Sequence, residues 1–218
     1  VRRRQEISPQ SRVAVAEDLI LALEPQVQRL SRSAMNLDLG DPRAKELFEA
    51  VGRVRDLEPQ GRVPAGAGVL GVTFAQWTPA ASERDAPREA LSLLRPLLEQ
   101  VRYFEHAKFY FVSGTVAAGD DEFNSLVGFT GLARALNGSR LAVDGRFDVR
   151  WRRHRDPKKP EPVWLIAGWN TKELRSQEAG GLLFEDVLDD ALPIAAQRNN
   201  ARRSVPEELL LDLNTRSG

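Results

Sequence analysis

A strict alternation of apolar and charged residues at positions 140–153 most constrains the fold of this chain. The odd positions carry Leu141, Val143, Gly145, Phe147, Val149 and Trp151, and the even positions carry Arg140, Ala142, Asp144, Arg146, Asp148, Arg150 and Arg152. Side chains of a β-strand point alternately to opposite faces, so the pattern predicts a long strand with one apolar and one charged face. Such a strand belongs to an antiparallel sheet covered on one side only. The charged row is then either a solvated surface or the lining of a cleft. Within this strand we expect Trp151 to be mostly buried and Arg150 to be mostly exposed.

Neighbouring segments extend this strand into an antiparallel meander. Residues 107–117 and 122–135 alternate around aromatic side chains. Asn137 and Gly138, just before the charged strand, are a strong hairpin signal because both residues tolerate positive φ. Residues 163–174 are apolar on both faces, which predicts a strand that is central or covered on both sides.

Helical spacing dominates the first half of the chain. Apolar residues recur at helical intervals over residues 12–32, where Pro25 predicts a kink or a junction of two helices. Further helices are predicted from Asp41 and over residues 85–103. The remaining segments are predicted as a Pro- and Gly-rich loop at 57–68 and a short strand at 69–77. This order predicts an α+β fold in which a curved antiparallel sheet wraps around N-terminal helices.

The chain is long enough for one domain with appendages. Its 218 residues are 42% apolar, which is sufficient for a core. We expect a flexible start at residues 1–12, an α+β domain at 13–176, and a connector towards a downstream domain or partner at 177–218. Within that connector, Phe184 is expected to dock on the domain, and residues 206–218 are expected to contact a second chain or a further domain.

Composition excludes several classes of function. Lys and Arg total 31, as do Asp and Glu, and a net charge of zero argues against an electrostatic nucleic-acid binder. The absence of cysteine excludes disulfides, zinc–thiolate sites and thiol catalysis. No window approaches the apolar length of a membrane span. We therefore expect no metal, no cofactor, no nucleic acid and no span of a membrane.

Two histidines are the first candidates for acid–base chemistry. His106 follows Glu105, so a histidine–carboxylate pair is conceivable, but a histidine that anchors a helix–strand corner is the preferred interpretation. His154 lies among arginines at the end of the charged strand, and we expect it to be exposed. Two histidines this far apart form no metal signature.

The charged strand offers a second set of candidates. If its polar face lined a cavity, Asp148 would be a candidate base and Tyr110 a hydrogen-bond donor. Arg146 and Arg150 would lie beside Asp148, keep it ionised and form ion pairs with it. A ladder of charges across strands is therefore the preferred interpretation. The same two arginines are candidate binding residues.

Tryptophans are the remaining candidates for ligand binding. Trp164 and Trp169 lie in the last predicted strand, where they could stack on a sugar or an apolar ligand. Core packing explains their positions equally simply, because most tryptophans of this chain fall within predicted strands. Both interpretations stay open for these two residues, with core packing preferred.

The order of elements resembles the nuclear-transport-factor-like (cystatin-like) cone fold shared by the SnoaL and ketosteroid isomerase families. A closer resemblance rests on three phrases: EHAKF at residues 105–109, FDVRWR at 147–152 and LFEDV at 183–187. Together they resemble the amino-terminal domain that precedes an FG-GAP propeller in ASPIC/UnbV-type bacterial exported proteins. The resemblance covers residues 91–213 and implies a periplasmic or extracellular location. The isomerase motif does not match this sequence residue by residue, so no catalytic residue is carried over.

We therefore expect a non-catalytic binding or assembly module, the front domain of a larger exported FG-GAP propeller protein. Its expected partner is its own downstream propeller, another protein subunit or a second copy of the chain. The alternative is a small-molecule-binding or isomerase-type enzyme that uses the cavity of the cone. A cavity with mixed polar and apolar lining would favour the enzyme, and a filled cone would favour the module.

Overall fold

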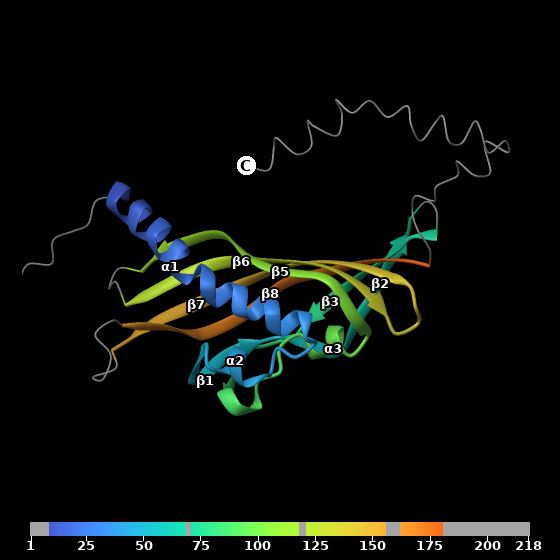
Figure 1. The fold of residues 1–218 in the computed structure, drawn as a ribbon, viewed down its shortest axis with the longest axis horizontal. Coiled ribbons are helices and arrows are strands. Elements are labelled where there is room, and N and C mark those ends of the chain that lie inside the picture. The colour runs from blue at the N-terminus through green and yellow to red at the C-terminus, as the bar shows by residue number, and fades with distance from the viewer. Residues whose placement is uncertain (1–8, 69–70, 118–120, 156–161, 181–218) are drawn as a thin grey trace, which may run out of the picture. The chain divides into compact units, whose positions relative to one another are not determined.

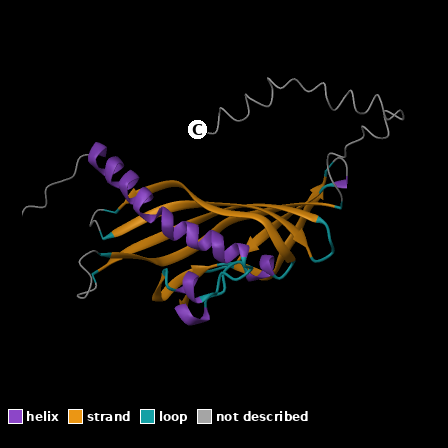
Figure 2. Cartoon of the chain, viewed as in Figure 1, coloured by secondary structure: helices purple, strands orange, loops and turns teal. Residues whose placement is uncertain are grey.

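The computed structural model describes residues 9–68, 71–117, 121–155 and 162–180. In chain order they form α1 (Pro9–Met35), α2 (Pro42–Lys45), β1 (Phe48–Arg55), β2 (Leu57–Ala67), β3 (Thr73–Pro79), β4 (Arg84–Pro87), the 3₁₀ turn η2 (Arg88–Ala90), α3 (Arg95–Leu98), β5 (Val101–Val116), β6 (Glu122–Ala135), β7 (Arg140–His154) and β8 (Val163–Ala179). α1 lies across a curved sheet (Figure 1), and strands make up most of the fold (Figure 2). The predicted α+β class, a helix followed by a curved antiparallel sheet, is confirmed.

Regular structure extends past both ends of the predicted domain at residues 13–176. α1 begins at Pro9, and β8 continues to Ala179. All described residues belong to one compact unit. Most of the predicted connector, including Phe184 and residues 206–218, lies outside the described residues.

The sheet is organised around β8. Within the described residues, eight strands form the order β2-β3-β8-β7-β6-β5, with β1 and β4 off this path. β5 to β8 pair antiparallel in chain order, which is the predicted meander. Along its other edge β8 carries two strands in succession: β1 pairs parallel with residues 166–170, and β3 pairs antiparallel with residues 174–178. β8 is therefore a central strand, as predicted.

The hairpin between β6 and β7 is confirmed. Gly138 has a φ of 84°, the positive value that the turn requires. Ser139 Oγ and Asn137 Nδ2 donate to Glu178 Oε1 of β8, at 2.6 and 2.8 Å. These two hydrogen bonds, with a smaller contribution from Arg62, hold the pKa of Glu178 below its ordinary value. The turn is therefore tied to the centre of the sheet by side chains as well as by the backbone ladder.

The predicted register of β7 is also confirmed. Its odd side chains are buried, with Phe147 and Trp151 fully so, and its even side chains lie on the other face. Arg150 differs from expectation, because it is half-buried rather than mostly exposed. Its aliphatic stem lies against the backbone of Gly168 in β8, where no side chain keeps it away.

α1 continues through Pro25 as one helix, so the alternative of two helices that meet at Pro25 is wrong. Proline removes one backbone hydrogen bond to residue 21. Leu21 is 74% exposed, so water is available to the freed carbonyl group. The opposite side of the helix is buried along Leu23, Val27, Leu30 and Ala34. Ser31 Oγ also accepts a hydrogen bond from Phe109 N, at 2.8 Å, and so covers part of the free edge of β5.

The helix predicted from Asp41 is wrong beyond its first turn. Asp41 does cap α2, since its Oδ1 accepts from Ala44 N at 2.6 Å, but the helix ends at Lys45. Phe48 and Val54, expected on a helical face, are buried in β1 instead. Pairing of β1 with β8 supplies the hydrogen bonds of this segment, and such long-range pairing overrides local helical spacing.

Two other segments differ from prediction because of proline. Residues 57–68, predicted as a loop, form β2, which contains Pro59 and Pro64. An edge strand tolerates proline because half of its N–H groups have no ladder partner. Residues 85–103 contain β4, η2, α3 and the start of β5 rather than one helix. Prolines interrupt helical bonding there, and Leu94 takes a positive φ of 55°.

Aromatic rings fill the space between α1 and the sheet. This aromatic layer consists of Phe104, Phe109, Phe111, Phe123, Phe129, Phe147, Trp151 and Trp169. Ring centroids lie 4.6 Å apart for Phe109–Phe129 and for Phe147–Trp169. Neighbouring pairs lie up to 6.4 Å apart, within the range of favourable aromatic contacts. The cone is therefore filled where these rings meet.

Replacing Trp151 by Ala should lower the free energy of unfolding by about 3–5 kcal/mol, because it empties a fully buried site in this layer. It also leaves Ser125 Oγ without the Trp151 Nε1 donor, now at 2.9 Å. Urea unfolding followed by circular dichroism measures the loss. Trp151→Phe is the matched control and should lose less. Equal stability of the wild type and Trp151→Ala would contradict the burial.

Asp56 lies at the corner between β1 and β2 and is the most strongly shifted carboxylate among the described residues. Burial raises its pKa to about 6, against the lowering effect of backbone hydrogen bonds from Leu94 and Leu57 and of the charge on Arg84. Leu94 N donates to its Oδ2 at 2.9 Å. Its Oδ1 is shielded from solvent and has no hydrogen-bond partner among the described residues.

Stability should therefore fall as the pH rises through this group. The folded state holds the proton of Asp56 more tightly than the unfolded state, whose pKa is near 3.8. The stabilisation is full below pH 4 and is lost by about pH 6, a change of up to about 3 kcal/mol. Asp56→Asn keeps an acceptor for Leu94 but does not titrate. Unfolding free energies measured from pH 4 to pH 7 should fall more for the wild type than for the variant, and parallel curves would contradict this assignment.

Candidate functional site

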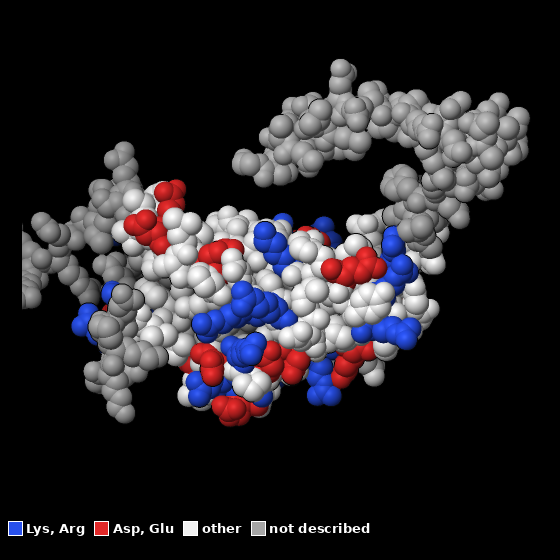
Figure 3. All heavy atoms as spheres, in the orientation of Figure 1, with Lys and Arg blue, Asp and Glu red and all other residues white. Residues whose placement is uncertain are grey.

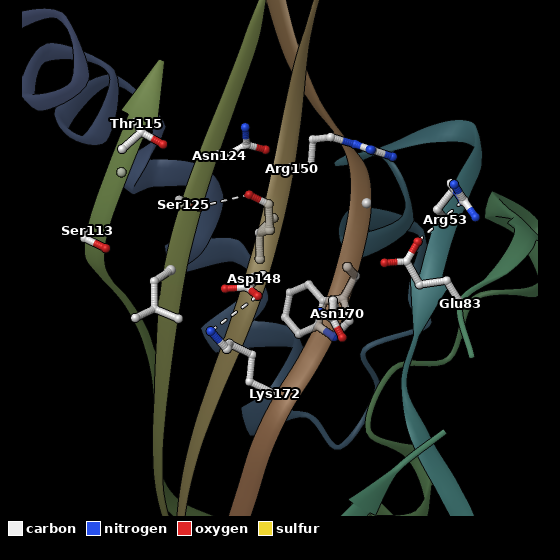
Figure 4. Close-up of a pocket in the computed structure, with 15 residues that line it drawn as sticks. Arg53, Glu83, Ser113, Thr115, Asn124, Ser125, Asp148, Arg150, Asn170 and Lys172 are labelled. Carbon is white, nitrogen blue, oxygen red and sulfur yellow. Dashed lines mark hydrogen bonds and ion pairs between the residues drawn. The ribbon is translucent and has the colours of Figure 1, made fainter. Parts of the chain in front are cut away.

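A polar hollow lined by several strands lies on the outer face of the sheet, away from the aromatic layer. It has a volume of about 520 Å³. Its charged lining residues are Arg53, Glu83, Asp148, Arg150 and Lys172, and its neutral polar ones include Ser113, Thr115, Asn124 and Asn170. They come from β1, β5, β6, β7, β8 and the segment before β4 (Figure 4). We call this hollow the outer groove.

Four of the five charges in the outer groove are paired. Arg53 Nε lies 3.5 Å from Glu83 Oε2, and Lys172 Nζ lies 3.6 Å from Asp148 Oδ2. Both pairs are well exposed, so each contributes little to stability and exchanges easily with another charged group. These pairs line the groove without closing it.

Arg150 is the charge that forms no ion pair within the described part of the chain. Figure 4 shows its side chain extending from β7 over the backbone of β8. A Cβ atom at Gly168 would lie 3.4 Å from its Nε and Nη2 atoms, so the guanidinium lies flat on this glycine. Arg150 Nε and Asn170 Oδ1 are both shielded from solvent and lack hydrogen-bond partners among the described residues. Arg150 thus brings a guanidinium without an ion-pair partner among the described residues to the wall of the groove.

Three of the candidate residues named from sequence meet at this groove: Asp148, Arg150 and Trp169. Asp148 pairs with Lys172 of the neighbouring strand rather than with either adjacent arginine. Trp169 lines the base of the groove, but its ring is buried in the aromatic layer and the residue is only 1% exposed. The arginines and lysine that line the groove belong to a ladder of charges across β1, β7 and β8.

Tyr110 and Arg146 form a separate pair on the same face. Arg146 Nη1 donates to Tyr110 Oη at 2.9 Å, and its guanidinium carbon lies 5.7 Å from the ring centroid. The ring covers Gly128, where a Cβ atom would lie 2.5 Å from Tyr110 Cζ. Arg146 also lies 3.7 Å from Asp144. Tyr110 and Asp148 are therefore engaged by different partners.

His106 and Trp164 lie elsewhere. His106 is an exposed residue within β5, not at a helix–strand corner, and Glu105 pairs with Arg134 at 3.3 Å. Trp164 is half-buried and packs on the edge of the core. The structure brings neither residue to the outer groove.

Sequence reasoning missed a cluster around Glu49. This carboxylate is 9% exposed and accepts hydrogen bonds from Arg152 Nη1 at 3.0 and 3.1 Å. His154 Nε2 lies 2.7 Å from Glu49 Oε1, so His154 is half-buried rather than exposed. β1 and β7 meet here only because both pair with β8. With residue 49 predicted in a helix, no signal in the sequence pointed to this cluster.

Glu49→Gln should lower the free energy of unfolding by about 1–3 kcal/mol, because it weakens two charge-assisted hydrogen bonds to a buried group. His106→Gln, which changes an exposed histidine, should stay within about 0.5 kcal/mol of the wild type. Chemical denaturation at pH 7 compares the two variants. Equal losses would show that the Glu49 cluster has no special role in stability.

Among the described residues, no group of three or more His, Asp or Glu side chains is arranged to hold a metal ion. No helix in this part of the chain is long and apolar enough to cross a membrane.

The elements and their packing define a cone-type α+β domain with a filled interior and a polar groove outside. No protein-family model matches the sequence, and no curated protein matches it. Several solved structures are weakly similar to this chain. The dehydrochlorinase LinA-type3 from Novosphingobium barchaimii is 14% identical, with a TM-score of 0.41 over 77% of this chain and 98% of its own. The NTF2-like superfamily protein from Salmonella enterica is 11% identical, with a TM-score of 0.42 over 78% and 96%. Kfla4162 from Kribbella flavida is 12% identical, with a TM-score of 0.43 over 73% and 91%.

Proposed function

We propose that this chain is a non-catalytic binding or assembly module that receives a polar group of a partner in the outer groove. The aromatic layer carries this proposal. An enzyme that uses the cavity of a cone needs interior space for its substrate. Here aromatic rings occupy that position, with adjacent centroids 4.6–6.4 Å apart. The polar hollow lies on the opposite face.

The chemistry of the groove favours an acidic group on the partner. Arg150 presents a guanidinium without an ion-pair partner among the described residues, and this planar fork binds carboxylates through two parallel hydrogen bonds. The exposed Lys172–Asp148 pair can open to accommodate further polar contacts.

The partner that we propose is an FG-GAP propeller of the ASPIC/UnbV type, in a periplasmic or extracellular location. Its support is the resemblance of three sequence phrases, two of which, at residues 105–109 and 147–152, fall in β5 and β7. The Asp-rich calcium loops of such propellers carry the carboxylates that suit Arg150. A second protein subunit or a second copy of the chain would use the same groove.

The test is the affinity of the purified chain for a propeller of this type, measured by isothermal titration calorimetry. Arg150→Glu should weaken binding at least tenfold, because it places like charges opposite each other. Arg95→Glu is the matched control. Arg95 is an exposed arginine on α3 that pairs with Glu99 and lies outside the groove, so its variant should bind like the wild type.

Three outcomes would contradict the proposal. Equal weakening by both variants would show that binding does not use the outer groove. The absence of a complex with the wild-type chain would show that the propeller is not the partner. Turnover of a ketosteroid-like or lactone substrate that is lost on changing Asp148 or His106 would replace the module with the isomerase-type enzyme.

A further inference from the structure

A second hollow, independent of the outer groove, lies where the end of α1 meets α2. It has a volume of about 340 Å³. Its lining residues are Arg29, Arg32, Ser33, Asn36, Asp41, Arg43 and Glu46. Figure 3 shows basic side chains gathered near the centre of the view, over the region where Figure 1 places the end of α1 and α2. We call this hollow the arginine pocket.

Three guanidinium groups reach the arginine pocket from two elements. Arg29 and Arg32 are three residues apart on α1 and so lie on one side of the helix, and Arg43 comes from α2. Within the described residues, none of the three has a carboxylate oxygen within 4.0 Å. Other arginines of the protein, such as Arg53 and Arg95, do have such a partner.

Two carboxylates, Asp41 and Glu46, also line the arginine pocket, but no ion pair joins either of them to its arginines. Asp41 Oδ1 accepts from Ala44 N at 2.6 Å, and its Oδ2 accepts from Ser33 Oγ at 2.9 Å. Ser33 is buried, so this geometry is fixed by the fold. Asp41 is thus oriented by the cap of α2 and by Ser33 rather than by an arginine, and three guanidinium groups face two carboxylates in the arginine pocket.

The helix dipole gives a simpler account of only one of these arginines. Arg32 lies in the last turn of α1, where a positive charge is favourable. That effect falls off within one turn and acts on α1 alone. Arg43 also lies in the last turn of its helix, but α2 has only four residues and therefore a small dipole, so the effect does not explain why Arg43 faces the same hollow.

We propose that the arginine pocket binds a phosphate-type oxyanion carried on a small molecule. A tetrahedral oxyanion presents three or four acceptor oxygens in different directions, which suits guanidinium forks that converge from two elements. A carboxylate offers two oxygens in one plane and would leave one arginine unused. The volume equals that of roughly eleven water molecules, so it accommodates the anion and part of the group that carries it.

Titrations at low ionic strength, followed by calorimetry and by amide chemical shifts, test this site. The probes are inorganic phosphate and ribose 5-phosphate. The wild-type chain should bind saturably, with shifts concentrated at the end of α1 and in α2. Tighter binding of the monoester would support a carried phosphate group, whereas equal affinity would overturn that part of the proposal, because the carrying group would then make no favourable contact.

The variant for this test is the triple change Arg29→Gln, Arg32→Gln and Arg43→Gln. Each lost guanidinium should weaken binding about tenfold, so the triple variant should show no saturation. Arg95→Gln, an exposed arginine outside the pocket, is the control and should bind within twofold of the wild type. All three pocket arginines are exposed, so the variant should keep its thermal unfolding midpoint within a few degrees.

Unchanged binding by the triple variant, or the absence of saturable shifts in the wild type, would overturn the proposal. Equal weakening by Arg95→Gln would show a general charge effect and would overturn it too. None of these results depends on Arg150, so the proposals for the arginine pocket and for the outer groove are tested independently of each other.

Discussion

The packing of Phe109, Phe147 and Trp169 against one another is the interaction on which the rest of the structure depends. Their rings come from β5, β7 and β8, and their centroids lie 4.6–6.0 Å apart. Shifting any of these strands by one residue would move its ring to the opposite face, so the contact fixes the register of the sheet. It therefore also decides that the charged row of β7 faces outwards, where the outer groove forms.

Local pattern was sufficient for most of the second half of the fold, although β5 begins at Val101 rather than at residue 107 and β8 ends at Ala179 rather than at residue 174. β6 and β7 were predicted to within one residue, because period-two alternation and a turn that needs positive φ at Gly138 are both local signals. β2 was missed because Pro59 and Pro64 are typical of a loop, and β1 was missed because its hydrogen bonds depend on a distant partner. Phe48 pairs opposite Ile166, more than a hundred residues away, and no short window contains that information.

The same distinction separates the site residues that were predicted from those that were not. Asp148 and Arg150 were identified because they belong to the alternating strand. Arg53 reaches the outer groove only through the pairing of β1 with β8. Side chains that belong to no recognisable sequence pattern, such as Glu49 and Arg43, become part of a cluster only when the fold brings two elements together.

The two edges of the sheet have a consequence for how this protein associates. β2 carries Pro59 and Pro64, which cannot donate backbone hydrogen bonds to an added strand. On the other edge, the Phe109 N–H is already taken by Ser31 of α1. A long open strand edge allows polymerisation by strand addition, and the prolines of β2 and the hydrogen bond to Ser31 both oppose such addition. A sheet protected in this way can have an edge strand sixteen residues long without offering a template for fibril growth, and its association with other molecules is directed to its faces.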